Sequence, residues 1–153
     1  QSTAIGGTLG TITPATTSGA WSGAFAGVQW TDTTGRARVS NTWPANTAYT
    51  AGTCVAYFYN DQNIVYEIQA DGSMAQTTIG GEYNFNNLTN GSTTTGLSQC
   101  TLNSASAAAA GAQGQMRVVD LAPYVDNAWG DSFTIVRVVN AQSQFFGSVT
   151  AIA

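Results

Sequence analysis

Histidine and lysine are both absent from this sequence, and cysteine occurs only twice, at Cys54 and Cys100. Catalytic arrangements of the Ser-His-Asp and Cys-His types are excluded, because each requires an imidazole as the general base. Zinc sites are built mainly from histidine and cysteine, so we predict neither a metal site nor a cofactor. The absence of lysine also excludes a P-loop for nucleotide phosphates.

Charge of either sign is scarce as well. Charged residues make up 8% of the 153 residues, with four arginines against eight carboxylates and a net charge of −4. Nucleic acids are bound through clustered lysines and arginines that neutralise several phosphates, so no nucleic acid is a predicted partner. A polybasic membrane-binding face is excluded on the same ground. Since no apolar run approaches the roughly 20 residues that cross a bilayer, we predict no membrane insertion.

The polar surface must come from Thr, Ser, Asn, Gln and Gly, a composition typical of extracellular proteins, and we therefore predict a secreted, extracellular protein. In that setting an even pair of cysteines favours a Cys54–Cys100 disulfide over two thiols. Such a bridge would stabilise the fold by about 4 kcal/mol by restricting the unfolded chain. Gln1 is interpreted as the end left by signal-peptide cleavage. Two back-to-back sequons predict glycosylation at Asn87 and Asn90.

The apolar pattern predicts strands rather than helices. Apolar and polar residues alternate around Val28 and Trp30, and a turn at 32–35 follows, which predicts a hairpin. Residues 54–59 and 64–68 are rich in aromatic and β-branched side chains and predict a second hairpin. Two further β-branched runs, at 115–119 and 133–139, predict additional strands. No long segment repeats apolar side chains at helical spacing.

These strands predict an all-β fold, an antiparallel β-sandwich or barrel with one disulfide. A propeller-like arrangement is the less favoured alternative. We expect residues 1–20 to form an N-terminal strand or arm and residues 21–153 to form a single β domain. A chain of this length buries enough apolar surface for one core.

Aromatic side chains near turns give the clearest indication of a binding site. Several tryptophans lie beside glycine, proline or turn residues, and such a ring can stack on the C–H face of a sugar while nearby Asn, Asp and Arg bind the hydroxyls. The candidate ligand-binding residues are Trp21, Trp30, Trp43, Tyr59, Glu67 and Trp129. The alternative for each tryptophan is a place in the core.

Glu67 lies in an apolar strand between Tyr66 and Ile68, where desolvation would raise the pKa of its carboxyl group, as a general acid requires. Paired with a second carboxylate it would serve glycoside hydrolysis, the catalytic class that survives the exclusions above. The alternative is that Glu67 points to solvent on an alternating strand. The four arginines either pair with carboxylates as structural bridges or hold ligand hydroxyls.

Residues 55–74, which read VAYFYNDQNIVYEIQADGSM, resemble one blade of the fungal fucose-binding lectins. Blades of that family run from an aromatic strand through a turn, a strand with a glutamate and an Asp/Gly turn to a tryptophan. The resemblance implies sugar binding, with Glu67 at the position of the sugar-binding glutamate. The arginine and tryptophan of that family are not matched, because Val55 or Ala56 stands at the arginine position and Met74 near the tryptophan position.

Together these observations predict a secreted, lectin-like carbohydrate-binding protein whose partner is a glycan or a cell-surface glycoprotein. The first alternative is a secreted defence, effector or structural protein that recognises another protein. The second alternative is a two-carboxylate glycosidase, although a binding protein is favoured over an enzyme.

Overall fold

The computed structural model describes residues 2–5, 10–43, 46–86, 91–92, 94–147 and 151. The described chain contains eleven strands and one short 3-10 helix, with 36% strand. All strand pairs recorded in it are antiparallel. The all-β prediction is therefore confirmed. None of the described residues belongs to a helix of the length and apolarity needed to cross a membrane.

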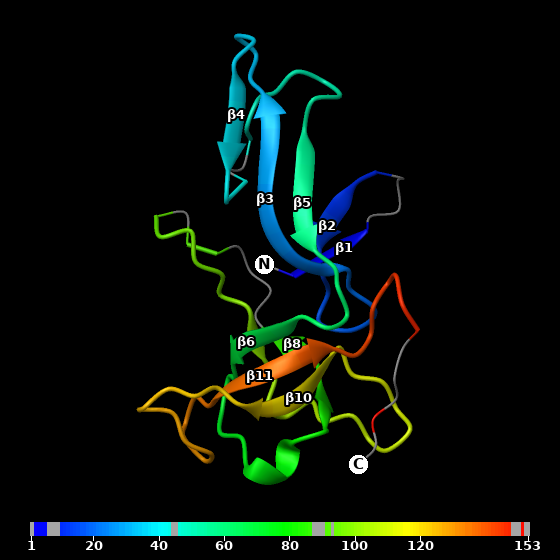
Figure 1. Cartoon of the computed structure of the whole chain (residues 1–153), viewed down its shortest axis with the longest axis vertical. Helices are drawn as coiled ribbons and strands as arrows, with labels where there is room; N and C mark the ends of the chain where they lie inside the picture. Colours follow the sequence, from blue (N-terminus) through cyan, green and yellow to red (C-terminus); the bar gives the residue numbers. More distant parts are fainter. Residues whose placement is uncertain are drawn as a thin grey trace.

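Five strands form the N-terminal sheet. Its central strand is β3 (Gly23–Thr31), which lies between β4 (Ala37–Ser40) and β5 (Val55–Tyr59) in Figure 1. The start of β3 also pairs with β1 (Ser2–Ile5), which in turn pairs with β2 (Ile12–Pro14). The β3–β4 pair is the hairpin predicted around residues 32–35, and that prediction is confirmed.

Glycine is required where β3 begins. A Cβ atom at Gly23 would lie 1.6 Å from the carbonyl oxygen of Tyr59, so a larger residue would force β3 and β5 apart. Further along, the pairing of these two strands shifts register between Phe25 and Gly27. A bulge of this kind bends its strand, and β3 is strongly curved in Figure 1.

The second sheet has the strand order β6–β11–β10–β7, and a short pair, β8–β9, accompanies it. Their bounds are β6 (Val65–Gln69), β7 (Glu82–Tyr83), β8 (Phe85–Asn86), β9 (Thr101–Leu102), β10 (Met116–Leu121) and β11 (Ile135–Asn140), with the 3-10 helix η1 at Gln76–Thr78. The strands predicted at 115–119 and 133–139 correspond to β10 and β11. The sequence pattern therefore located both.

The second predicted hairpin is wrong, although both of its strands exist. β5 and β6 match the predicted runs at 54–59 and 64–68, but β5 pairs with β3 and β6 pairs with β11. The turn between β5 and β6 carries the chain from one sheet to the other. Alternating side chains identify a strand and its buried face, but they do not identify its partner.

The hydrophobic core lies against the second sheet. Its buried members are Ala15, Trp21, Ala70, Met74, Tyr83, Phe85, Leu102, Met116, Val118, Val136 and Val138. Apart from Ala15 and Trp21, all of them follow β5 in the sequence. The alternation on β11 explains the packing, because Val136 and Val138 are buried whereas Arg137 between them faces outward.

The predicted disulfide and the barrel alternative are both wrong. Cys54 and Cys100 are not at disulfide distance. Cys54 is exposed just before β5 in the N-terminal sheet, whereas Cys100 precedes β9 and packs against the core of the second sheet. The cysteines therefore belong to different parts of the fold. The sheets are antiparallel but do not close into a barrel.

Asp71 connects the end of β6 to the β8–β9 pair. Its Oδ1 accepts hydrogen bonds from the backbone nitrogen and the Oγ of Ser104, each at 2.8 Å, and its Oδ2 accepts one from Nδ2 of Asn86 at 2.6 Å. Burial raises the pKa of the Asp71 carboxyl, but the hydrogen bonds outweigh this effect and lower that pKa below its ordinary value.

We expect the free energy of unfolding to fall as the pH drops below about 4, and we expect Asp71→Asn to make that fall shallower. A carboxyl whose pKa is lower in the folded than in the unfolded chain stabilises the fold above the unfolded value. This contribution is lost as the pH falls toward the folded value. Urea unfolding of both proteins between about pH 7 and pH 3 measures the effect. Parallel curves for the two proteins would contradict the role of Asp71.

Candidate functional site

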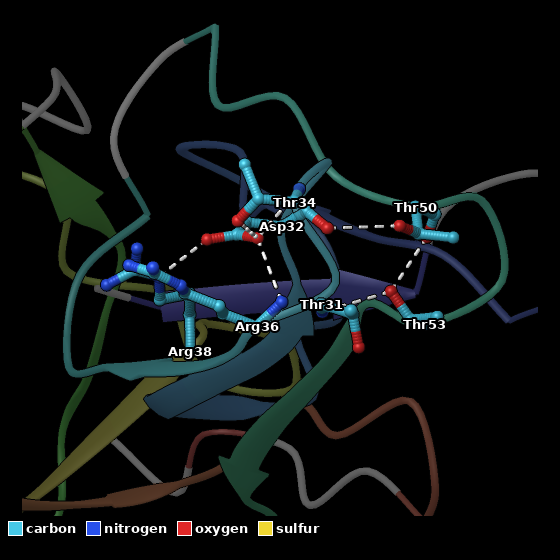
Figure 2. Close-up of polar contacts among 7 residues, drawn as sticks. All are labelled: Thr31, Asp32, Thr34, Arg36, Arg38, Thr50 and Thr53. Carbon is cyan, nitrogen blue, oxygen red and sulfur yellow. Dashed lines mark hydrogen bonds and ion pairs between the residues drawn. The ribbon is translucent and has the colours of Figure 1, made fainter.

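The turn between β3 and β4 is organised by one carboxylate. Oδ1 of Asp32 accepts hydrogen bonds from the backbone nitrogen of Thr34 at 2.9 Å, from Oγ1 of Thr34 at 2.6 Å and from the backbone nitrogen of Arg36 at 3.0 Å (Figure 2). Gly35 completes the turn with a φ of 84°, a conformation that favours glycine. Aspartate is well suited here, because its short side chain reaches backbone groups two residues ahead.

The same carboxylate holds Arg38. Nε of Arg38 donates to Oδ2 of Asp32 at 2.8 Å, as drawn in Figure 2, while half of the Arg38 side chain, 50%, stays exposed. Hydrogen bonds from Thr34, from the backbone of Arg36 and from Arg38 hold the pKa of the Asp32 carboxyl well below its usual range. Asp32 therefore remains ionised at ordinary pH, and it keeps Arg38 in a fixed place.

Two threonines tie the chain segment before β5 to the same turn. The backbone nitrogen of Thr50 donates to the carbonyl oxygen of Thr31 at 2.8 Å, and Oγ1 of Thr53 accepts from the backbone nitrogen of Thr31 at 3.1 Å. Oγ1 of Thr50 also donates to the carbonyl oxygen of Asp32 at 3.2 Å (Figure 2). These contacts hold the segment, and with it Tyr49, beside the end of β3.

Three aromatic rings gather next to this turn. The ring centroids of Trp30 and Trp43 are 5.3 Å apart with an interplanar angle of 82°, and those of Trp43 and Tyr49 are 5.7 Å apart at 73°. Such edge-to-face contacts hold rings in defined orientations. Trp43 and Tyr49 remain 39% and 44% exposed. Arg38 lies directly opposite Trp30 in the β3–β4 register and therefore on the same face of the hairpin.

We call this group the tip platform: Trp30, Trp43 and Tyr49, with Arg38 and its anchor Asp32. It combines flat apolar faces with a cation whose position is fixed. An aromatic face accepts the apolar side of a ring-shaped ligand, and a guanidinium group binds oxygen atoms through several N–H donors. Because hydrogen bonds already order the turn, little further ordering is needed on binding.

The structure places the other candidate residues elsewhere. Trp21 is 2% exposed within the core, and Trp129 is half-buried against that core. Tyr59 is 58% exposed at the end of β5, on the N-terminal sheet but outside the tip platform. Glu67 lies on the second sheet. The predicted glycosylation sites Asn87 and Asn90 lie outside the described residues.

Glu67 is exposed, and it borders a shallow hollow of about 890 Å³ on the outer face of the second sheet. The wall of the hollow includes Glu67, Gln69, Tyr124, Asp126, Asp131 and Phe133. The hydroxyl of Tyr124 donates to Oε2 of Glu67 at 2.5 Å, and this hydrogen bond and the negative charge of Glu67 raise the pKa of the Tyr124 hydroxyl.

Arg137 lies on the same outer face of the second sheet as Glu67. It lies opposite Glu67 on β6 and Asp120 on β10, and its Nη2 is 2.8 Å from Oδ2 of Asp120. A glycosidase requires two carboxyl groups about 5–10 Å apart across its substrate. The glycosidase alternative stays a prediction.

Sequence reasoning does not single out Arg38 or Tyr49 as binding residues. The predicted hairpin register does contain a signal for Arg38, because a turn at 32–35 places it across from Trp30. No local signal connects Tyr49 to Trp43, since their contact depends on the threonine hydrogen bonds that position the segment before β5.

No family model matches this chain, and comparisons with curated proteins and with solved structures likewise gave no match. The resemblance of residues 55–74 to a lectin blade therefore stays a prediction.

Proposed function

We propose that this protein binds carbohydrate at the tip platform. The observation that carries the proposal is the exposed cluster of Trp43 and Tyr49 against Trp30, next to an arginine that Asp32 holds in place. A sugar has an apolar C–H face and a rim of hydroxyls, so it needs an aromatic surface and a small number of fixed polar groups. The tip platform offers both.

The way a sugar would bind follows from the exposure of each group. The ring would lie on Trp43 and Tyr49, the more exposed aromatic side chains, while the terminal nitrogens of Arg38 donate to its oxygens. Secretion and a partner on a cell surface belong to the same proposal. They are supported by the nearly uncharged composition, which relies on neutral polar side chains for solubility.

Trp43→Ala is expected to weaken sugar binding at least tenfold, or about 1.4 kcal/mol, because it removes the central ring of the platform. A glycan array probed with the purified protein identifies a ligand, and calorimetry then compares the variants. Phe133→Ala is the matched control, since Phe133 is an exposed aromatic residue, 60% accessible, in the turn before β11 of the second sheet. We expect it to bind as the wild type does.

Two outcomes would contradict this proposal. Loss of binding in Phe133→Ala but not in Trp43→Ala would move the site to the hollow beside Glu67. A flat array with protein that is folded by circular dichroism would reject carbohydrate binding altogether.

Protein recognition is the second candidate, and one observation favours it. Val39, Val55, Tyr57 and Tyr59 share the face of the N-terminal sheet opposite to Trp30, and each is at least 48% exposed. Apolar side chains gathered on one exposed face are typical of a protein-binding surface. A flat glycan array from folded protein would leave this candidate as the better supported of the two.

A further inference from the structure

Charge is divided unevenly along this chain. Residues up to Tyr59 contain one aspartate and two arginines, a net charge of +1, whereas the remainder contains seven carboxylates and two arginines, a net charge of −5. Both arginines of the first part, Arg36 and Arg38, lie in the β3–β4 hairpin. The part of the chain with a net positive charge therefore has both of its arginines in this hairpin, and one of them, Arg38, belongs to the tip platform.

The single carboxylate at the tip, Asp32, offsets one of the two arginine charges and leaves the hairpin with a net charge of +1. Oδ1 of Asp32 accepts three hydrogen bonds within the turn, and its Oδ2 accepts one from Nε of Arg38. Arg38 uses Nε for Asp32, and the described chain records no hydrogen bond from its two Nη atoms. Arg36 takes part through its backbone, and its side chain is exposed.

We propose that the tip platform selects acidic carbohydrates, in which a sugar ring carries a carboxylate or sulfate group. This inference rests on the proposed function and specifies its ligand. The ring would occupy the aromatic face, and the anionic group would meet Arg38, whose guanidinium matches the two oxygens of such a group. Charge-assisted hydrogen bonds of this kind are about twice as strong as neutral ones.

The second sheet would not accept the same ligand. Glu67, Asp126 and Asp131 line its hollow, and Arg137 on that sheet uses a terminal nitrogen, Nη2, for Asp120, whereas Arg38 uses Nε for Asp32. An acidic sugar would meet negative charge there and positive charge at the tip. The uneven charge thus orients the ligand toward one end of the molecule.

The test uses matched pairs of oligosaccharides of equal length. One pair is an oligogalacturonate and its carboxyl-reduced neutral form, and the other is a sulfated oligosaccharide and its desulfated form. Calorimetry on the full chain should give at least about tenfold tighter binding for the acidic member of one pair or both, and this preference should shrink as salt is added. The pair that shows the preference identifies whether the tip platform recognises a carboxylate or a sulfate group.

Arg38→Gln is expected to weaken binding of both members but to bring their affinity ratio close to one. Trp43→Ala should weaken both members by similar factors and leave the ratio unchanged. Arg137→Gln removes an arginine from the other sheet, where its side chain is 36% exposed against 50% for Arg38, and it should retain the preference. Thermal unfolding of each variant verifies that it is folded.

Each remaining outcome has a distinct meaning. Equal affinities within both pairs, or a preference that survives Arg38→Gln, would overturn the proposed selectivity for acidic sugars. If the neutral oligosaccharides still bind in that case, the proposed function, carbohydrate binding at the tip platform, is retained. Failure of all four oligosaccharides together with a flat glycan array would reject both proposals.

Discussion

Glu82→Ala is expected to lower the free energy of unfolding by about 3–5 kcal/mol. The Glu82 side chain is completely buried at the end of the second sheet, and its Oε1 is 2.6 Å from Nη2 of Arg117. Its Oε2 accepts from the backbone nitrogen of Gly114 at 2.8 Å and from Nε2 of Gln113 at 3.2 Å. Alanine would leave these donors without their carboxylate, and the hydrogen bond from the Gly114 backbone nitrogen would be lost in a buried place.

Urea unfolding measures this loss, and Glu67→Ala is the matched control. Glu67 is the chain's other glutamate, and it is exposed, so its replacement should change the free energy of unfolding by no more than about 0.5 kcal/mol. Glu82→Gln keeps the shape and one acceptor oxygen, and we expect a loss between those of the two alanine variants. A loss below 1 kcal/mol in Glu82→Ala would show that the buried pair contributes little to stability.

The second large effect is expected from Trp21→Ala, which should destabilise the fold by about 3–5 kcal/mol. The Trp21 ring contacts Phe85 edge-to-face with centroids 5.0 Å apart and lies 5.6 Å from Tyr66. Its Nε1 donates to the carbonyl oxygen of the buried Gln115 at 3.2 Å. Truncation would leave a cavity in the core and remove one of the hydrogen bonds to this carbonyl oxygen, which also accepts from the backbone nitrogens of Ala141 and Gln142.

Trp43→Ala provides the comparison, since Trp43 is partly exposed and lies outside the core cluster. Chemical unfolding of both variants should show a much larger loss for Trp21. Equal losses, or a larger loss for Trp43→Ala, would mean that the tip platform contributes to folding as much as the core does.

The local pattern of apolar and polar residues predicted the strands but not how they pair. The alternation around Val28 and Trp30 identified a hairpin correctly, because a short turn determines the pairing. β5 and β6 were located but paired wrongly, since their partners lie far away in the sequence. The cysteines show the same limitation: composition favoured a bridge, and only the placement of Cys54 and Cys100 in different parts of the fold excludes it.

The candidate site was predictable only in part. Trp30 and Trp43 stood out as aromatic residues near turns, and they meet in the structure. Trp21 has a similar sequence context beside glycine, yet it lies in the core. Residue type and neighbours cannot separate these two cases, because burial is decided by contacts with distant residues such as Gln115.

The tip platform and the core draw on different segments of the chain. Core residues come almost entirely from the second sheet and its connections, while the rings and the arginine of the platform come from the hairpin and the segment that precedes β5. Evolution can therefore alter what the tip recognises without eroding the scaffold that carries it. New specificities would then require changes only in the hairpin and in the segment that carries Trp43 and Tyr49.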